Sequence, residues 1–561
     1  MKRFAAVLCL VAITAVVATA AGKPEYDLII RNGRVLDGAG NPWVHTEIAV
    51  RGDRIVKMAR HISGSARRII DANDQVVSPG FIDMHTHSDL TLLTDGNAES
   101  KIRQGVTTEI LGEASSVAPV CKAVLAESGA SAMGGGSGPR RDWTDFDGYY
   151  RKLLHRGTSV NVASYIGLST VRLCAMGPDM RDPTPAELGK EIQIVGQAMR
   201  QGAIGLSSGL IYPPGSYAKT DEIVALAKVA SQYGGIYTSH IRNEGNGLLD
   251  AIDETLTIAD QAHIPVHILH IKATGSHSTD NAAAAIAKIA DARARGLEVT
   301  ADQYPYIASS TGLATHVPEW VQDGGTPKMV KRLRDPETRA KIRDIVVRAN
   351  SDPEKMVIAS LHKPDNKKLE GLSIGEAAKL RNEDPNDTVL NLLSEENGRV
   401  GMVFFTMKED DVRNFMKQPW VSFGSDGSAV RPDGPLGEGR PHPRFYGSNV
   451  RVLGRYVRED RVLTLEDAVR KMTSLAAQQV GIHNRGVLAE GMKADIVVFD
   501  PDRVIDKATF KDPHQFADGV NYVVVNGQVV IDAGKHTGKR PGQVIYGPGR
   551  GAAIAGKKTD K

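Results

Sequence analysis

Short apolar runs, many of them rich in β-branched residues, recur through the middle of the chain. Eight such runs begin near residues 80, 106, 159, 202, 234, 264, 297 and 420. Between several of them lie segments with apolar residues spaced three and four apart, such as 221–235 and 281–296, and both segments end at glycine. Strands that alternate with helices predict βα units and a parallel sheet, and eight runs match a (β/α)8 barrel.

Strand-like patterns also occur at both ends of the chain. Two apolar runs flank Asn32-Gly33, and two more flank Asn526-Gly527. Asn-Gly supplies the positive φ angles of a tight turn, so both pairs predict β-hairpins. We therefore expect an α/β protein in which the barrel lies beside a small β-sandwich domain formed from both termini. The expected ranges are 24–79 with 485–545 for the β domain and 80–484 for the barrel.

Four further segments interrupt or follow this alternation. The stretch from about 303 to 400 is too long for one connection and is rich in charge and proline, so we interpret it as a lid-like insertion over the barrel mouth. Residues 464–481 have helical spacing behind a threonine and predict one amphipathic helix. The glycine-rich segment 131–143 predicts a surface loop, and residues 546–561 predict a flexible tail.

Composition narrows the class of protein. Of the 561 residues, 41% are hydrophobic and 24% are charged, which is typical of a globular protein with a sizeable core. Lysine and arginine total 69 against 66 for aspartate and glutamate, a formal net charge of +3. This near balance argues against a general nucleic-acid binder and against a protein that charge holds on a membrane.

The first residues are typical of a secretory signal peptide. The basic residues 2–3 precede an apolar run that ends in a small-x-small cleavage pattern at residues 18–20. We predict a signal peptide over residues 1–20 and an exported protein, periplasmic or secreted; an uncleaved anchor is the alternative. No later segment is long and apolar enough to span a bilayer. Cleavage would leave two cysteines, Cys121 and Cys174, whose pairing the sequence leaves open.

Six residues of metal-binding type stand at the ends of five of the apolar runs. His85 and His87 end the first run, and both rings face one side because side chains alternate along a strand. Two histidines at the C-terminal end of a barrel strand can share a metal ion. The other four are Glu113 after the second run, His240 and His270 about one βα repeat apart, and Asp426 after the eighth run. The ends of barrel strands meet at one rim, so the sequence predicts a metal site there.

Longer motifs carry a resemblance to a known family. They include SPGFIDMHTHSD from Ser78, GAIGLSSGLIYPPGSYA from Gly202, YTSHIRNEG from Tyr237 and RGVLAEGMKADIVVFDP from Arg485. With these motifs the chain resembles the metal-dependent amidohydrolases, and among them the D-aminoacylase (N-acyl-D-amino-acid deacylase) family, over nearly the whole mature length. The resemblance implies a metal-bearing (β/α)8 barrel beside a small β domain from both termini.

The family pattern, transferred by position, also implies a ligand set for one or two divalent ions, zinc above all. Two sites share residue 113: a tighter one with His240 and His270, and a second with His85, His87 and Asp426. D-aminoacylases typically have a bridging cysteine at this position, whereas this chain has Glu113. A carboxylate can bridge two ions through its two oxygens. The alternative is that Glu113 only forms an ion pair near the site.

The resemblance implies hydrolysis of an amide bond in an N-acyl-D-amino acid. A bound zinc ion makes water nucleophilic near neutral pH and polarises a carbonyl. Asp426 is expected to accept the water proton and to deliver it to the departing amine. The products would be a carboxylate and the free D-amino acid. Candidates to hold the α-carboxylate of this small-molecule partner are Lys272, Tyr304, Ser310 and Arg444.

Three other functions compete with this one. A dipeptidase for D- or unusual dipeptides needs the same metal site and carboxylate clamp. Cyclic-amide hydrolases of the dihydropyrimidinase type bridge two metals with a carboxylated lysine on the fourth strand, and the fourth run here, GAIGLSSGL, contains no lysine. A non-catalytic ligand-binding relative is disfavoured because all six polar residues of the predicted site are present.

Overall fold

The computed structural model describes residues 24–127, 139, 141–275, 277–349 and 351–551. The predicted signal peptide and most of the glycine-rich segment 131–143 lie outside these residues. Within the described residues, eight parallel strands form a barrel, and β10 and β11 are two halves of its third strand. In chain order the strands are β8 (Phe81–Asp83), β9 (Val106–Leu111), β10 (Asn161–Ser164) with β11 (Ile166–Gly167), β12 (Gly205–Gly209), β13 (Ile236–His240), β14 (Val266–Ile268), β15 (Val299–Gln303) and β19 (Val421–Phe423).

Hydrogen bonds join the neighbouring strands around the barrel. Each strand pairs in parallel with the next, from β8 to β15, and β15 pairs with β19. The barrel closes where the Met84 N–H donates to the Phe423 carbonyl oxygen at 3.4 Å. Every strand falls within one of the eight apolar runs, so the predicted fold class is confirmed.

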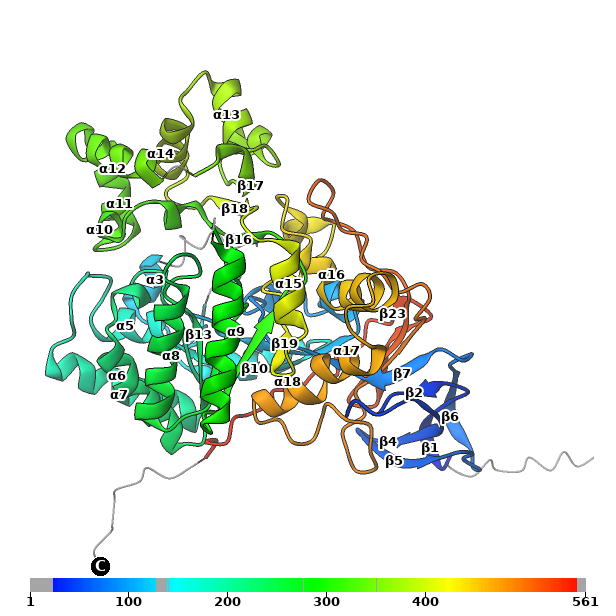
Figure 1. The fold of residues 1–561 in the computed structure, drawn as a ribbon. Helices are drawn as coiled ribbons and strands as arrows, with labels where there is room; N and C mark the ends of the chain where they lie inside the picture. Colours follow the sequence, from blue (N-terminus) through cyan, green and yellow to red (C-terminus); the bar gives the residue numbers. More distant parts are fainter. Residues whose placement is uncertain (1–23, 128–138, 140, 276, 350, 552–561) are drawn as a thin grey trace, which may run out of the picture.

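Helices cover the outside of the barrel (Figure 1). The two segments with helical spacing form α7 (Thr220–Gln232) and α9 (Ser278–Ala294). α6 (Pro185–Arg200) begins at a capping box, in which the side chains of Thr184 and Glu187 each accept a backbone N–H of the other. The remaining helices of the barrel include α1 (Thr91–Thr94), α2 (Glu99–Ile102), α3 (Lys122–Glu127), α4 (Phe146–Arg156), α5 (Leu168–Ala175), α8 (Leu248–Ala262), α15 (Glu409–Met416) and α16 (Arg444–Arg451).

The prediction of one continuous helix over 464–481 is wrong. Thr464 caps its start as expected, but the segment is divided at Thr473 into α17 (Leu465–Met472) and α18 (Ser474–Gln479). Thr473 has φ −130° and ψ −88°, outside helical geometry, and the next hydroxyl, Ser474 Oγ, donates to a carbonyl oxygen of the N-terminal segment at 2.6 Å. Hydroxyl side chains that bond to backbone groups compete with helical hydrogen bonds, which accounts for the break.

A smaller β domain, at the lower right of Figure 1, is built from both ends of the chain. Its two sheets have the strand orders β5-β4-β1-β6 and β23-β22-β21-β20-β7-β2-β3. Asn526-Gly527 forms the predicted hairpin turn between β21 and β22, with φ angles of 48° and 75°. The strands are β1 (Tyr26–Arg31), β2 (Arg34–Val35), β3 (Val44–His45), β4 (Glu47–Arg51), β5 (Arg54–Ala59), β6 (Ala66–Asp71), β7 (Val76–Pro79), β20 (Ile496–Phe499), β21 (Val520–Val525), β22 (Gln528–Asp532) and β23 (Lys535–His536).

The hairpin predicted at Asn32-Gly33 is wrong. β1 pairs with β4 and β6 in the four-stranded sheet, whereas β2 pairs with β3 and β7 in the seven-stranded sheet. The Asn-Gly pair therefore carries the chain from one sheet to the other. A Cβ on Gly33 would lie 2.5 Å from Val77 Cγ2, so close packing against β7, and not a hairpin, requires glycine here.

The stretch interpreted as an insertion contains a three-stranded antiparallel sheet, β16-β18-β17, and several helices around an apolar core of their own. It lies above the barrel in Figure 1. The Tyr212 hydroxyl lies 3.0 Å from Thr311 Oγ1, so the insertion reaches down to a loop after barrel strand β12. Its elements are β16 (Ser309–Gly312), β17 (Met356–Ser360), β18 (Gly401–Phe404), α10 (Glu319–Gln322), α11 (Thr326–Arg334), α12 (Pro336–Ala349), α13 (Ile374–Arg381) and α14 (Pro385–Glu395).

The described part of the predicted tail packs against the barrel. The Gly547 N–H donates to the Gly202 carbonyl oxygen at 2.9 Å, and the Tyr546 ring meets the Tyr150 ring edge to face at 5.5 Å. The expectation that a flexible tail begins at residue 546 is therefore wrong for its first residues. Residues 552–561 lie outside the described part of the chain.

Two further features concern the chain as a whole. Cys121 and Cys174 form a disulfide, with Cα atoms 5.7 Å apart, which joins the segment after β9 to α5. Among the helices of the described residues, none combines the length and the apolar character that a bilayer crossing requires.

A buried charged cluster lies where α5, α6 and α7 meet. Arg172 of α5 is fully buried and pairs with Glu222 of α7. Glu191 of α6 is equally buried, and neither of its carboxylate oxygens has a hydrogen-bond partner among the described residues. Burial, together with the negative charge of Glu222, raises the pKa of Glu191 to about 8.

The raised pKa of Glu191 predicts a pH-dependent loss of stability. Between its ordinary value of 4.5 and about 8, the folded state holds a proton that the unfolded state has lost, so stability falls as pH rises through this window. Glu191→Gln removes the charge, and we expect the variant to exceed the wild type by about 1–3 kcal/mol at pH 8 and to match it near pH 5. Thermal unfolding of both proteins at the two pH values checks this. Parallel curves of stability against pH would contradict it.

Candidate metal centre

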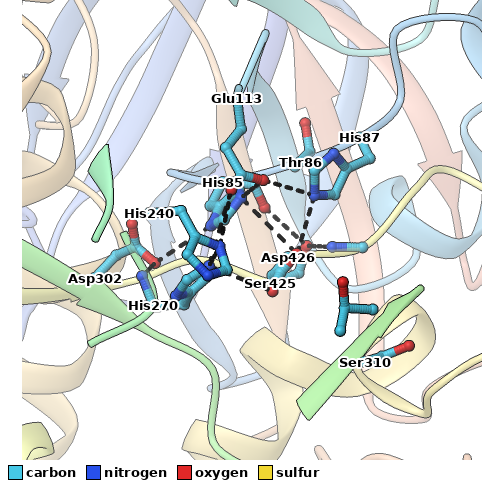
Figure 2. Close-up of polar contacts among 12 residues, drawn as sticks. His85, Thr86, His87, Glu113, His240, His270, Asp302, Ser310, Ser425 and Asp426 are labelled. Atoms are coloured by element: carbon cyan, nitrogen blue, oxygen red, sulfur yellow. Dashed lines mark hydrogen bonds and ion pairs between the residues drawn. The ribbon is translucent and has the colours of Figure 1, made fainter. Parts of the chain in front are cut away.

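Six side chains converge at the carboxyl ends of the barrel strands. Figure 2 shows them around one point, with Glu113 between two sets of imidazoles. They form two groups that share Glu113, and within each group the potential ligand atoms lie within 4.8 Å of one another. The groups are His85, His87, Glu113 and Asp426, and Glu113, His240 and His270. The structure thus brings together all six residues that the sequence predicted as ligands.

The two carboxylate oxygens of Glu113 face different histidines. Oε2 lies 2.8 Å from His85 Nε2 and 3.0 Å from His87 Nε2. Oε1 lies 3.2 Å from His240 Nδ1 and 3.9 Å from His270 Nε2. Each oxygen therefore belongs to one of the two groups, which is the arrangement that a carboxylate bridge between two ions requires.

The chemistry of these donors fits a divalent ion. Imidazole nitrogens and carboxylate oxygens are ligands that zinc accepts, and all six residues are buried or nearly so. Burial lowers the pKa of His270 to about 4, helped by the neighbouring Lys272 ammonium, so this ring is neutral and can coordinate. Burial also opposes ionisation of His87, but hydrogen bonds to Asp426 and Glu113 outweigh it and raise the pKa of His87 to about 10. Acids packed this closely need positive charge nearby, from protons or from a metal.

Two acidic side chains outside the groups orient His270. The Asp302 carboxylate accepts the His270 backbone N–H at 3.0 Å, and its other oxygen lies 2.8 Å from His267 Nε2. Glu244 Oε1 lies 3.1 Å from His270 Nδ1. A ring held at Nδ1 presents Nε2 to a metal, as second-layer carboxylates commonly arrange. Asp302 was not among the residues that the sequence predicted for the site, although it lies near the end of the seventh strand.

The backbone of two site residues adopts the left-handed conformation. His270 has φ 36° and Asp426 has φ 49°, values that are uncommon for residues other than glycine, although histidine and aspartate take them more often than most. Such residues persist only where their surroundings hold them, and they concentrate at functional sites. In both cases the unusual turn comes just after a strand and directs the side chain into the shared centre.

Asp426 belongs to the group of His85 and His87 and also contacts Arg444. Its Oδ1 is 3.0 Å from His87 Nε2, and its Oδ2 is 2.9 Å from Arg444 Nη1. Burial favours the neutral acid, but the Arg444 guanidinium and the His85 ring outweigh burial and hold the pKa of Asp426 well below its usual range. Asp426 is therefore a carboxylate at neutral pH and can accept a proton.

The four residues predicted to contact substrate lie close to one another, and one of them, Arg444, pairs with Asp426. The Tyr304 ring lies near two cations, with Arg444 Cζ 4.7 Å and Lys272 Nζ 5.6 Å from its centroid. Arg444 Nη2 donates to the Ser310 carbonyl oxygen at 3.1 Å. Lys272 pairs with Glu244, and the Ser310 hydroxyl donates to a backbone carbonyl at 2.8 Å. Arg444 Nε is buried without a hydrogen-bond partner among the described residues.

A (β/α)8 barrel whose strand ends gather four histidines and two acids defines a metal-dependent hydrolase of the amidohydrolase class. The chain belongs to the amidohydrolase family, whose model matches residues 68–531. Within this family it is similar to enzymes that deacylate N-acyl-D-amino acids, which confirms the resemblance seen in the sequence.

Two relatives from Alcaligenes xylosoxydans xylosoxydans illustrate this similarity. An N-acyl-D-glutamate deacylase is 34% identical over 541 residues, which cover 95% of this chain and 99% of the relative. A D-aminoacylase is 34% identical over 521 residues, covering 93% and 97%. Both alignments span nearly the whole of each chain, so the similarity includes the barrel, the β domain and the insertion.

Solved structures agree with these relatives. An N-acyl-D-glutamate deacylase from Bordetella bronchiseptica, complexed with zinc and a phosphonate inhibitor, superposes with a TM-score of 0.80 at 33% identity and covers 93% of this chain and 99% of its own. An L-hydantoinase from Arthrobacter aurescens has a TM-score of 0.55 at 16% identity, which shows a shared fold alone.

Proposed function

We propose that this amidohydrolase binds one or two divalent ions, zinc above all, and cleaves the amide bond of N-acyl-D-amino acids. The observation that carries the proposal is the centre in which Glu113 joins two groups of histidines and Asp426 faces Arg444. The relatives that align over nearly their whole length are named as deacylases of N-acyl-D-amino acids, which supports the substrate class. Hydrolysis of the amide bond by water would release a carboxylic acid and a free D-amino acid.

The residues that would hold the ions are those of the two groups around Glu113. When bound, such an ion supplies Lewis acidity, which makes water more nucleophilic and polarises a carbonyl oxygen. His240 and His270 come from neighbouring parallel strands, so the barrel fixes their separation. The Glu244 and Asp302 contacts restrict His270 further, which preserves the ring orientation that coordination needs.

Asp426 carries the proton transfers in this proposal. As a carboxylate it accepts a proton from the attacking water, and it then returns that proton to the amine nitrogen as the C–N bond breaks. One group serves both steps because the proton taken up in the first is the one released in the second. The ion pair with Arg444 keeps Asp426 ionised before the reaction begins.

Arg444 is the strongest candidate to bind the α-carboxylate of the substrate. It is fully buried, it lies beside Asp426, and its Nε–H has no partner among the described residues. A planar guanidinium can bind a carboxylate through two parallel hydrogen bonds, and lysine lacks this geometry. A carboxylate held here would lie next to the group that protonates the departing amine.

Arg444→Lys is therefore expected to keep the positive charge beside Asp426 and to weaken substrate binding. Loss of a charge-assisted hydrogen bond of about 1.5–3 kcal/mol corresponds to a KM about 10–100-fold higher for an N-acetyl-D-amino acid. The matched control is the same substrate with its α-carboxylate converted to a carboxamide, whose weaker turnover should change little. Equal losses on both substrates would show that Arg444 does not recognise the carboxylate.

A panel of substrates tests the proposed activity. Purified, zinc-loaded protein is incubated with N-acetyl-D-amino acids, their L-enantiomers and matched D-dipeptides, and the free amine is quantified. The proposal predicts release of D-amino acids from the N-acetyl compounds at rates well above those for the other two sets. Hydrolysis confined to dipeptides would make the protein a dipeptidase, and hydrolysis confined to L-substrates would refute the stereochemical assignment.

We further propose that the chain is exported and that its first 20 residues are removed. The basic, apolar and small-x-small pattern of that segment supports export, and the Cys121–Cys174 disulfide is consistent with an oxidising compartment. Cell fractionation followed by N-terminal sequencing tests this: the mature chain should begin at Ala21. A chain that keeps Met1 or stays in the cytoplasm would refute the proposal.

A further inference from the structure

A fully buried lysine lies behind the metal centre, where the proposed reaction makes no use of it. Lys101 of α2 is 0% exposed. Its Nζ lies 3.0 Å from Asp83 Oδ2 and also contacts Ser425 Oγ. Asp83 ends barrel strand β8, just before His85, and Ser425 immediately precedes Asp426 (Figure 2). An ammonium group is costly to bury, so a lysine held in this place needs a physical reason.

The contacts of Lys101 lead to the backbone on both sides of Asp426. The other oxygen of Asp83, Oδ1, accepts the Ser425 N–H at 2.7 Å. Ser425 Oγ accepts the Gly427 N–H at 3.2 Å and donates to the His85 carbonyl oxygen at 3.3 Å. The residues before and after Asp426 are therefore tied to the ion pair of Lys101 and Asp83.

Asp426 itself needs such support. Its φ of 49° lies in the left-handed region, which aspartate tolerates better than most residues but which is still uncommon, and its N–H donates to the His85 carbonyl oxygen at 2.8 Å. If the turn relaxed, the carboxylate would leave its position between His87 and Arg444. A displacement of about 1 Å at a reacting group can cost about 100-fold in rate.

We propose that Lys101 is a positioning residue for Asp426, acting through Asp83 and Ser425. The inference rests on the proposed hydrolytic function and adds a residue that touches neither substrate nor metal ligand atoms. The Lys101 ammonium pairs with one oxygen of the Asp83 carboxylate, and the other oxygen accepts the Ser425 N–H. The Ser425 hydroxyl also contacts Lys101, and it bonds to the Gly427 N–H and the His85 carbonyl oxygen. These bonds hold the turn that places Asp426 in the centre.

The chain offers a matched control for this lysine. Lys471 of α17 is also 0% exposed, and its Nζ donates to the carbonyl oxygen of Val421 at 3.0 Å. Val421 begins β19, the strand that leads to Ser425 and Asp426, so Lys471 supports the opposite end of the same strand. Replacement of either lysine by methionine removes a buried ammonium group and is expected to lower the melting temperature.

The two variants should differ in turnover. Lys101→Met is expected to lower kcat for an N-acetyl-D-amino acid by about 10–100-fold with KM nearly unchanged, the range seen when outer-layer supports of a site are lost. Lys471→Met should keep kcat near the wild-type value. Equal loss of kcat in both variants, or wild-type kcat in Lys101→Met, would overturn the proposal.

Ser425→Ala tests the same path with a change small enough to preserve folding. Ser425→Ala should lower kcat, as Lys101→Met does. The double variant Lys101→Met/Ser425→Ala should have the same kcat as Lys101→Met alone, because both changes remove the same support of the Asp426 turn. Additive losses in the double variant would show that Lys101 does not act through Ser425.

A readout independent of turnover completes the test. The visible absorption of the cobalt(II)-loaded protein reports the ligand geometry around the ion, and it should change in Lys101→Met and not in Lys471→Met. If the wild type fails to hydrolyse any N-acyl-D-amino acid, the proposed function is wrong, and the cobalt spectra still decide the role of Lys101. Identical spectra for wild type and Lys101→Met would refute that role.

Discussion

Asp426→Asn is expected to lower kcat for an N-acyl-D-amino acid by about 10²–10⁴-fold, the range for loss of a general acid–base group. The amide side chain has nearly the shape of the carboxylate but cannot take a proton from water. Asp426 is buried, and its Oδ1 lies 3.0 Å from His87 Nε2 within the metal centre. Steady-state kinetics on the zinc-loaded variant measure the effect.

Metal analysis separates a loss of proton transfer from a loss of metal. The amide side chain of Asp426→Asn would still offer an oxygen to the His85 and His87 group, and the other group is untouched, so the variant should retain at least one ion. Asp433→Asn is the matched control, because Asp433 is exposed and pairs with Arg431 on the surface. Turnover by Asp426→Asn at the rate of this control would remove Asp426 from the mechanism.

Glu113→Ala is expected to weaken zinc binding by at least about 100-fold, more than the 10–100-fold typical of losing an outer-layer partner. Glu113 is common to both groups, so its loss removes one ligand from each site at once. Competition with a chromophoric chelator measures the affinity, and activity at limiting zinc should fall with it. Excess zinc should restore activity only in part, because the remaining ligands would bind zinc without the carboxylate that the two groups share.

A second glutamate on the same stretch of chain provides the control. Glu109 of β9 is also fully buried, four residues before Glu113, and it accepts a hydrogen bond from Ser88. Glu109→Gln alters a buried carboxylate nearby without removing a residue of either metal group, so its zinc affinity should equal that of the wild type. If Glu113→Ala binds zinc as tightly as Glu109→Gln does, Glu113 only forms ion pairs near the site.

The sequence predicted the barrel and the meeting of its six polar residues for one physical reason. Parallel strands buried on both sides must be continuous apolar runs, and their carboxyl ends must lie at one rim. A polar residue directly after such a run, as Glu113 and Asp426 are, is therefore placed by topology alone. His240 and His270 follow the same rule, and the structure brings all of them together.

Turn motifs in the sequence were less informative, because tertiary packing determines which strands a turn connects. Asn526-Gly527 makes a hairpin, whereas Asn32-Gly33 has the same two residues and connects two different sheets. Both turns accept a positive φ at asparagine, but the sequence does not show which sheet receives the next strand. The break at Thr473 is similar, since it depends on a contact between α18 and the N-terminal segment.

Long-range ion pairs were the part of the site that the pattern could not predict. Lys101 and Asp83 are 18 residues apart. Arg444 begins α16 and pairs with Asp426, which follows β19. Spacing identifies which residues stand at the rim, but partners behind the rim come from helices whose positions depend on packing. Asp302 is a different case, because it lies near the end of a strand and not on a helix. Its carboxylate contacts the backbone N–H of His270 and belongs to neither metal group.

The most direct test of the account is a crystal structure of the zinc-loaded protein with data collected on both sides of the zinc absorption edge. We predict anomalous density in contact with the Glu113 carboxylate, one peak shared with His240 and His270 and, when a second ion is bound, another shared with His85, His87 and Asp426. Zinc density found only away from Glu113, or none in protein that hydrolyses N-acyl-D-amino acids, would contradict the account.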